Sequence, residues 1–490
     1  MLRFYLDLNI LTKLKKYSES KEAYKILKNN LEQIKKDSII LYSSAHISDL
    51  LHGKNRNIQL INEDLQEIKE WTKGYCLNKY WNQNFVTHEV LDPFISYENS
   101  ARDFSSTDDI MTKVTEIFKE FDFEANGLSN PLDGFKQIPH NINLAEWDKP
   151  ENEKYSWLVN NFKNARKDSS FYALVLDVMQ MMSDLQTDDK KTQELRKIIR
   201  ENVKLENINN EYNIFHFLNS NVPKSFLNKT FSDFKDQFLN KAETNSFERY
   251  NRFLAAYNSI DFLGYHSDSK QNFASTVTDA NHAFYAAYCD VFISNDKKLR
   301  AKAKALYKEY NISTLVFSPE EFNMQWKISD TENFIDLLIQ ITKCISIAVE
   351  KRKYTFSADK NIIEVECTPK ILNFFNRIVV LTKEEEISCI LAKTNTNYAD
   401  LFFYTELAYV INKLHNLLGD DIDGRKPVDL QVEKNLSNYA WILRYWIVEN
   451  IEIEILLAEG TGMVLIITFS TEYESKTLSP ASPSYAPPEK

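Results

Sequence analysis

The chain has 490 residues, 43% hydrophobic and 26% charged, an ordinary globular composition with room for roughly two or three domains. Its formal net charge of −11 argues against general binding along a polyanion. No apolar run reaches about eighteen residues and the first one contains an acid, so we expect neither a membrane span nor a signal peptide. The five cysteines form no C-x-x-C pair, which indicates neither a disulfide framework nor a zinc knuckle and favours a cytoplasmic location.

The first segment reads as strand, helix, strand and short helix. A strand is predicted over residues 3–8 and contains Asp7, with Asn9 just beyond its end. A helix is predicted over about 20–36, a strand over 38–42, and a short helix from His46 that carries Asp49. Both acids are therefore expected where strands of an open α/β sheet present a ligand-binding edge.

Residues 56–269 predict mostly helices, because apolar residues recur there at three- and four-residue spacing. A structureless loop of this length is not compatible with a compact domain, so we expect a helical accessory domain inserted into the fold. Its role is either to position substrate or to serve as a scaffold.

A second acid-bearing segment follows. A helix carries Asp279 and His282, an apolar strand spans 291–293, and Ser294 and Asp296 follow that strand. A basic helix, a strand at about 313–317 and the run S-P-E-E-F complete the segment. Considered alone, Asp296 is most simply the cap of the helix it precedes, and His282 is most simply a packed or hydrogen-bonded residue.

Residues 326–475 form a C-terminal α+β region that we match to no family. Helices are predicted within 330–353 and 397–419, and strands over 360–367, 451–457 and 462–469, the last two as a hairpin. Four aromatic residues recur at helical spacing and are interpreted as core or partner-facing residues: Tyr439, Trp441, Tyr445 and Trp446. Residues 476–490 read as a disordered tail by composition.

The two acid-bearing pieces together resemble the PIN-domain family of metal-dependent nucleases, over residues 1–55 and about 270–325. The similarity lies in F-Y-L-D-L-N at Asp7, in Ser43 followed by Asp49 and Gly53, and in D-x-x-H-A-x-x-A followed by a strand and S-x-D. One departure is Asp49, where the family usually has Glu, one methylene longer. The resemblance implies a PIN-like parallel-sheet core, split by the helical insertion at 56–269.

The resemblance also implies a catalytic and metal-binding set of four aspartates, namely Asp7, Asp49, Asp279 and Asp296, with Asn9 and Ser294 orienting them. The cofactor expected is Mg²⁺ or Mn²⁺, because hard divalent ions prefer carboxylate oxygens and two such ions can activate water against a phosphodiester. The expected reaction is endonucleolytic cleavage of RNA that leaves 5′-phosphate and 3′-hydroxyl ends.

Charge within the chain supports a nucleic-acid substrate. Residues 1–55 hold 10 basic and 6 acidic side chains and residues 270–325 hold 7 and 6, a net of +5, which leaves −16 for the rest. The helix after Asp296 carries basic residues that we interpret either as a track for phosphates or as a solvated face: Lys297, Lys298, Arg300, Lys302, Lys304 and Lys308. The first three are the predicted substrate-binding residues.

The sequence leaves two other functions open. The enzyme could act on structured DNA rather than RNA, since RNA rests on the resemblance alone. Alternatively the core is inactive, and the chain is a binding or assembly protein. A bacterial toxin or defence effector fits the nuclease interpretation, but no residue selects a target, a protein partner, an inhibitor or an oligomeric state.

Overall fold

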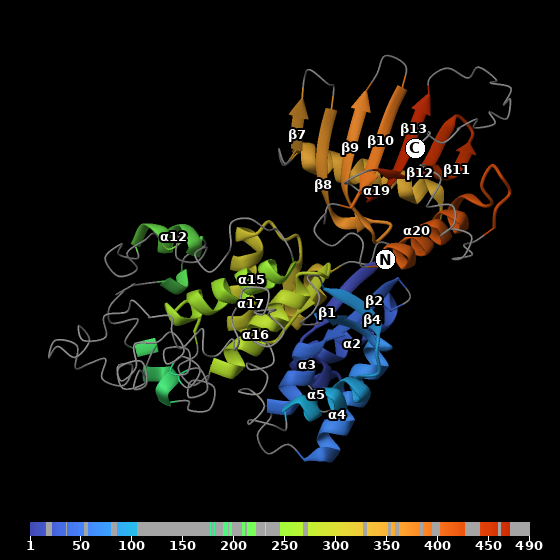
Figure 1. The fold of residues 1–490 in the computed structure, drawn as a ribbon. Coiled ribbons are helices and arrows are strands. Elements are labelled where there is room, and N and C mark those ends of the chain that lie inside the picture. The colour runs from blue at the N-terminus through green and yellow to red at the C-terminus, as the bar shows by residue number, and fades with distance from the viewer. Residues whose placement is uncertain are drawn as a thin grey trace, which may run out of the picture. The chain divides into compact units, whose positions relative to one another are not determined.

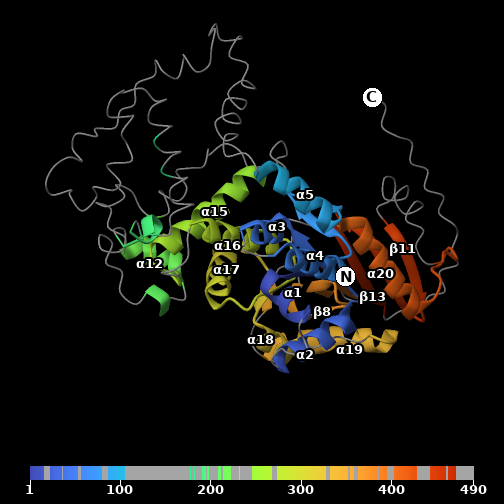
Figure 2. The same ribbon diagram turned by 90° about the horizontal axis from the view of Figure 1, so that it is seen from below.

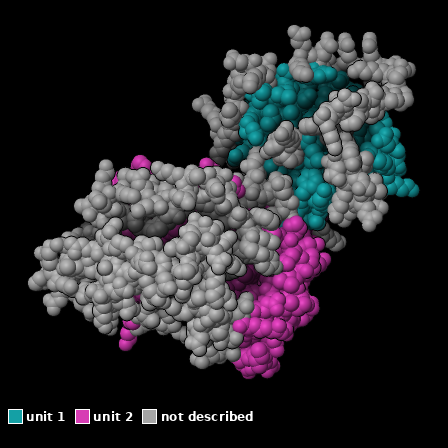
Figure 3. Space-filling model, in the orientation of Figure 1, with its two compact units in different colours: residues 1, 327–490 teal, residues 2–326 magenta. Residues whose placement is uncertain are grey.

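The computed structural model describes residues 1–104 and 246–470 with short gaps, together with short stretches between 177 and 231. It divides into two compact units: unit 1 comprises residue 1 and residues 327–490, and unit 2 comprises residues 2–326 (Figure 3). The fold is mixed α/β, with a largely parallel sheet in unit 2 and an antiparallel sheet in unit 1. Among the described helices, none has both the length and the apolar character needed to cross a bilayer.

Unit 2 is built on a six-stranded sheet in the order β4-β3-β2-β1-β5-β6 (Figure 1). Neighbouring strands are parallel except β3 and β4, which are antiparallel. The strands are β1 (Leu2–Leu6), β2 (Ser38–Ser43), β3 (Tyr75–Asn78), β4 (Thr87–Val90), β5 (Val291–Ile293) and β6 (Leu315–Phe317).

Strand β1 is the central strand, and all five of its residues are buried. A strand that is covered on both faces reads as a continuous apolar run, which is why L-R-F-Y-L does not alternate between apolar and polar residues. Strands β2 and β3 lie on one side of β1, whereas β5 and β6 lie on the other. The strand order therefore reverses at β1, and in open α/β sheets ligands bind beyond the carboxyl ends of the strands at such a point.

Hydrogen bonds outside the strand ladder hold β1 against the segment that contains β5. The backbone N–H of Arg3 donates to Asp290 Oδ2 at 2.8 Å, and the N–H of Asp290 donates to the carbonyl oxygen of Arg3 at 2.8 Å. At the other end of β1, the N–H of Asp7 donates to the carbonyl of Ile293 at 3.0 Å. These contacts fix the register between two segments that are far apart in sequence.

Helices surround this sheet, and α16 occupies a central place among them. It packs against β1 and against α3, α15 and α17 (Figures 1 and 2). The helices of unit 2 whose bounds the structure describes are α1 (Leu8–Lys15), α2 (Glu22–Ile34), α3 (Ser44–His52), α4 (Ile58–Thr72), α5 (Pro93–Phe104), the 3₁₀ turn η4 (Ile208–Asn210), α12 (Ile214–Asn221), α15 (Ser246–Phe262), α16 (Phe273–Ala286), α17 (Lys297–Glu309) and α18 (Pro319–Gln325).

The predicted elements of both acid-bearing pieces are present. The strand at 38–42 is β2, the helix from about residue 20 is α2, and the short helix near His46 is α3. The strand at 291–293, the basic helix and the strand at about 313–317 are β5, α17 and β6. One local difference is that β1 ends at Leu6, so that Asp7 lies between β1 and α1 rather than within the strand.

The predicted insertion boundaries at 56 and 269 do not coincide with the edges of the sheet domain. Strand β3 pairs with β2, and β4 pairs with β3, so the sheet continues beyond residue 55. Helix α15, near the other boundary, packs on α16 and α17. The sequence pattern missed β3 because its residues Y-C-L-N directly follow the helical pattern of α4, and it missed β4 because T-H-E-V is not an apolar run. Most of the remaining insertion lies outside the described residues, as does the predicted tail at 476–490.

Unit 1 contains a seven-stranded sheet in the order β11-β12-β13-β10-β9-β8-β7, antiparallel throughout (Figure 1). Helices α19 (Phe334–Glu350) and α20 (Phe403–Leu418) share one core with residues from one face of this sheet, so both helices cover the same face. The strands are β7 (Tyr354–Ser357), β8 (Ile362–Ile371), β9 (Phe375–Thr382), β10 (Glu386–Ala392), β11 (Ile442–Val448), β12 (Ile451–Ala458) and β13 (Gly462–Ser470).

Unit 1 confirms some sequence predictions and corrects one. The two predicted helices are α19 and α20, and the predicted hairpin is β12 with β13. The helical spacing inferred for Tyr445 and Trp446 is wrong, because both lie on strand β11. Trp446 is buried in the core and donates its ring N–H to the carbonyl of Gly419 at 3.0 Å. Tyr439 and Trp441 lie outside the described residues.

A capping box fixes the start of α18, the last helix of unit 2. The N–H of Glu321 donates to Ser318 Oγ at 3.1 Å, and the N–H of Ser318 donates to Glu321 Oε2 at 2.7 Å. The substitution Ser318→Ala should lower the free energy of unfolding by about 1 kcal/mol, because it removes the acceptor for one helix-end donor. Urea denaturation measures this loss, and Ser318→Asp should retain most of the stability. Equal stability of Ser318→Ala and wild type would contradict the assigned cap.

Candidate functional site

Asp7 is the buried centre of the site. It follows the central strand β1 directly, and its residue is only 4% exposed. Its carbonyl oxygen accepts bonds from the N–H groups of Ile10 and Leu11, so Asp7 also begins helix α1. The carboxylate is thus held between the end of a strand and the start of a helix, beside β5.

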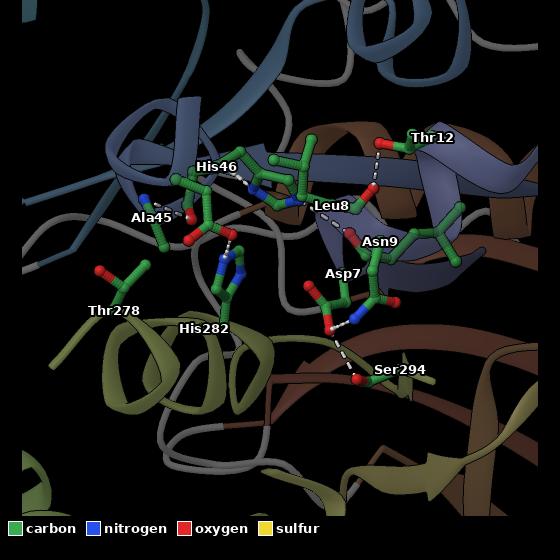
Figure 4. Close-up of polar contacts among 12 residues, drawn as sticks. Asp7, Leu8, Asn9, Thr12, Ala45, His46, Thr278, His282 and Ser294 are labelled. Carbon is green, nitrogen blue, oxygen red and sulfur yellow. Dashed lines mark hydrogen bonds and ion pairs between the residues drawn. The ribbon is translucent and has the colours of Figure 1, made fainter. Parts of the chain in front are cut away.

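Two polar side chains hold one oxygen of the Asp7 carboxylate. Asn9 donates its amide N–H to Asp7 Oδ2 at 2.7 Å, and Ser294 donates its hydroxyl to the same atom at 2.6 Å (Figure 4). Ser294 directly follows β5, so it meets Asp7 because β1 and β5 are parallel neighbours. Within the described residues, side-chain bonds to Asp7 use only Oδ2, which leaves Oδ1 available to another ligand.

Asp49 reaches the site from helix α3 and is paired with His282 of helix α16. His282 Nε2 donates to Asp49 Oδ2 at 3.0 Å, and Figure 4 shows the imidazole of His282 directed at its carboxylate partner. The side chain of His282 is 2% exposed, whereas that of Asp49 is 35% exposed. A buried ring therefore fixes the orientation of a carboxylate that is partly open to solvent.

The second ring nitrogen of His282, Nδ1, contacts a buried hydroxyl group. The hydroxyl of Tyr5, on β1, lies 2.9 Å from His282 Nδ1, 2.6 Å from Ser43 Oγ and 3.3 Å from His46 Nδ1. Because a phenol both donates and accepts, it can serve His282 in either protonation state of Nδ1. Tyr5 thereby connects the central strand to the helix that positions Asp49.

His46 is a neutral structural member of the same network. Its Nε2 lies 2.7 Å from the carbonyl oxygen of Leu6, so Nε2 carries the hydrogen, and its Nδ1 accepts from the N–H of Ser43 at 3.1 Å. Burial and the neighbouring His282 lower the pKa of His46 to about 3. A proton on Nδ1 would point at the N–H of Ser43, so the geometry also disfavours the protonated form of His46.

The site concentrates negative charge in a poorly solvated place. Burial raises the pKa of Asp7 more than His282 and Ser294 lower it, and the carboxylates of Asp49 and Asp296 raise it further. Burial lowers the pKa of His282, but its hydrogen bond to Asp49 and the charges of nearby carboxylates outweigh burial, so the net pKa is raised. The raised pKa of Asp7 and the raised pKa of His282 both indicate that negative charge exceeds positive charge in this cluster.

The structure brings together Asp7, Asp49 and His282, whose potential ligand atoms all lie within 4.8 Å of one another. This set differs from the predicted set of four aspartates, since His282 is included while Asp279 and Asp296 are not. The sequence interpretation of His282 as a hydrogen-bonded residue agrees with its contacts.

Asp296 and Asp279 lie around this group. Asp296 is exposed and caps helix α17, where its Oδ1 accepts from the N–H groups of Lys298 at 2.7 Å and Leu299 at 2.9 Å. Its own N–H donates to Ser294 Oγ at 3.0 Å, which joins it to the contacts around Asp7. Asp279, on α16, is half-buried and raises the pKa of His282 by its charge.

The basic residues of α17 are divided between surface and core. Lys297 is exposed and Lys298 half-buried, directly after Asp296. Arg300 donates from Nη1 to the carbonyl of Ser294 at 2.6 Å and lies 4.0 Å from Glu321, so it braces the segment after β5.

Lys302 is not part of an exposed phosphate track, contrary to the surface interpretation of this helix. It is fully buried and its Nζ lies 2.7 Å from Asp261 Oδ1, while Arg196 Nη2 lies 2.6 Å from Asp261 Oδ2. The sequence could have indicated that Lys302 is buried. Residues three and four apart share a helix face, and Lys302 follows the buried Leu299 at that spacing.

Sequence reasoning did not identify the role of Tyr5. A tyrosine inside the apolar run of β1 resembles any other core residue, and only the fold places its hydroxyl between two histidines. The sequence pattern puts His46 at the start of the short helix that carries Asp49 but indicates no role for it.

No family model, curated protein or solved structure matches this chain.

The substitution Asp7→Asn, in metal-free protein at pH 7, should leave the free energy of unfolding unchanged or raise it. The pKa of Asp7 is raised above its ordinary 3.8, so the charged form destabilises the fold above the raised pKa. That penalty disappears as pH falls through the raised pKa toward 3.8, and the difference between variant and wild type should shrink there. Urea denaturation in EDTA at pH 7 and near pH 4 measures it.

Asp64→Asn is the matched control, because Asp64 is a buried carboxylate of the same unit that pairs with Lys15 at 2.8 Å. It should be less stable than wild type at pH 7. A clear loss of stability in Asp7→Asn would show instead that the bonds from Asn9 and Ser294 outweigh the cost of the buried charge.

Proposed function

We propose that unit 2 is a metal-dependent phosphodiesterase, an endonuclease that cleaves RNA at the site around Asp7. The observation that carries this proposal is the meeting of Asp7, Asp49 and His282 within 4.8 Å at the carboxyl end of the central strand. Their separation in sequence makes the meeting a property of the fold and not of a local turn.

The donor set suits a hard divalent cation. Two carboxylates supply oxygen, the ligand atom that Mg²⁺ and Mn²⁺ prefer, while His282 orients one of them. Asp7 Oδ1 accepts no side-chain hydrogen bond within the described residues, and the carboxylate of Asp49 is partly exposed. A cation would also relieve the charge that raises the pKa of Asp7.

Each side chain has a distinct task under this proposal. When bound, the cation supplies an activated water and stabilises charge on the phosphate oxygens. Asp7 would hold it, with Asn9 and Ser294 fixing the carboxylate orientation through Oδ2. His282 would hold Asp49 in place, with Asp279 and Asp296 as further carboxylates at the rim. Supporting groups of this kind strongly affect metal affinity.

RNA is proposed as the substrate from the resemblance to PIN-domain nucleases together with the local charge. Lys297 and Lys298 begin the helix that Asp296 caps, which puts two cations next to the site. They would contact backbone phosphates and would carry no sequence preference. Arg300 would act indirectly, through the carbonyl of Ser294.

A second candidate is an inactive binding or assembly protein. It is favoured by the partners that two of the carboxylates already have: Asp49 is paired with His282 and Asp296 caps α17. In that case the group around Asp7 would be a structural network, and added Mn²⁺ would not stabilise the fold.

Wild-type protein should cleave labelled RNA in Mn²⁺ or Mg²⁺ and not in EDTA. Asp7→Asn should lose at least roughly a hundredfold in rate, the upper end of what even an indirect metal partner contributes. Product analysis should find 5′-phosphate ends. Labelled DNA, single-stranded and flapped, is incubated in parallel, and faster cleavage of DNA would replace RNA as the substrate.

Asp64→Asn serves again as the control and should cleave as fast as wild type at a temperature where both are folded. If wild type and Asp7→Asn cleave at the same rate, the observed nuclease does not use this site. If neither cleaves and Mn²⁺ leaves the thermal midpoint unchanged, the second candidate replaces the first.

A further inference from the structure

Tyr257, on helix α15, is a buried residue with an unsatisfied hydroxyl. Its side chain is 0% exposed, and within the described residues its oxygen has no hydrogen-bond partner. An unpaired buried hydroxyl destabilises a fold, so native proteins keep few of them, and each one requires an explanation. Tyr257 plays no part in the contacts described above around Asp7.

The fold places Tyr257 beside the acid-bearing helices. Helix α15 packs against α16, which carries Asp279, and against α17, which Asp296 caps (Figures 1 and 2). The sequence predicts helix α15 as part of the accessory insertion at 56–269, and its helical pattern gives no signal that Tyr257 lies near the acids.

A buried ion-pair network fixes the ring of Tyr257. Lys302 Nζ lies 4.7 Å from the ring centroid and 2.7 Å from Asp261 Oδ1. Asp261 in turn pairs with Arg196 at 2.6 Å, and Arg196 Nη2 donates to Thr276 Oγ1 of α16 at 2.8 Å. The ammonium of Lys302, itself held by Asp261, therefore stabilises the ring of Tyr257 in its place between α16 and α17.

The carboxylates of the candidate site lie close enough to Tyr257 to act on its hydroxyl electrostatically. Burial raises the pKa of Tyr257, and four carboxylates raise it further, in the order Asp279, Asp261, Asp296 and Asp7. Asp261 already has two cationic partners, whereas the other three belong to the proposed metal-binding set. The phenol therefore keeps its proton and remains a hydrogen-bond donor in the neighbourhood of these carboxylates.

We propose that Tyr257 is a positioning residue of the aspartate site, whose hydroxyl donates a hydrogen bond to a water molecule of a hydrated Mg²⁺ or Mn²⁺ held by Asp279 and Asp296. This inference rests on the proposed metal-dependent function. A hydrated cation explains why the donor lacks a protein partner, since Mg²⁺ in particular keeps several of its waters when it binds. It also gives the helix α15 a direct part in the site.

Tyr257→Phe tests the inference, because it removes only the hydroxyl. In EDTA the variant should be as stable as wild type or more stable, since no hydrogen bond is lost. Its dissociation constant for Mn²⁺ should rise about tenfold, within the range for groups that contact a metal indirectly. Urea denaturation in EDTA and calorimetric titration with Mn²⁺ measure the two effects without relying on activity.

Tyr250→Phe is the matched control on the same helix, because the hydroxyl of Tyr250 donates to Asn281 Oδ1 at 2.8 Å. It should be less stable than wild type and should bind Mn²⁺ with unchanged affinity.

Three outcomes would overturn the inference. Equal Mn²⁺ affinity of Tyr257→Phe and wild type overturns it alone and leaves the proposed function intact. A loss of stability of Tyr257→Phe in EDTA also overturns it, because the hydroxyl would then have a protein partner. Absence of Mn²⁺ binding by wild type overturns the proposed function and this inference together.

Discussion

The parallel pairing of β1 with β5 is the interaction on which the rest of unit 2 depends. It places Asp7 next to Ser294 across 287 residues of sequence, and it is reinforced at both ends by backbone bonds of Arg3 and Asp7. Residues that follow neighbouring parallel strands meet at one edge of the sheet, and at β1 the strand order of unit 2 also reverses. The same reversal leaves room beyond the sheet for helix α16, which brings His282 to Asp49.

Electrostatics and hydrogen bonding act in opposite directions at this point of the fold. Burial and like charge disfavour the ionised form of Asp7, while Asn9, Ser294 and the raised positive character of His282 favour it. The polar groups of Tyr5, His46 and His282 near Asp49 satisfy one another by hydrogen bonds. Their burial therefore costs little free energy, and the side chains are held in place. A site with fixed carboxylates and an incomplete set of counter-charges is the arrangement that a cation would stabilise most.

Sequence patterns predicted the strand ends well and the environment of side chains poorly. Asp7 and Ser294 could be placed together because residues that follow neighbouring parallel strands meet at one edge. Strand β3 directly follows the helical pattern of α4 and was hidden by it, and Tyr257 in a helical pattern looks like ordinary core. Which carboxylates already have partners, such as Asp296 at its helix and Asp49 with His282, depends on contacts between distant segments. These contacts carry no periodic signal in the chain.

The position of the central strand has a consequence for how the protein is made. A ribosome adding roughly 5–20 residues per second would complete β1 about 15–60 s before β5 emerges. During that interval Arg3 and Asp7 lack the neighbour that aligns them, since Asp290 and Ile293 have not been synthesised. The arrangement of Asp7 beside Ser294 therefore forms late in translation, and a truncated product that stops before β5 would contain Asp7 and Asp49 without the residues that meet them in the complete fold.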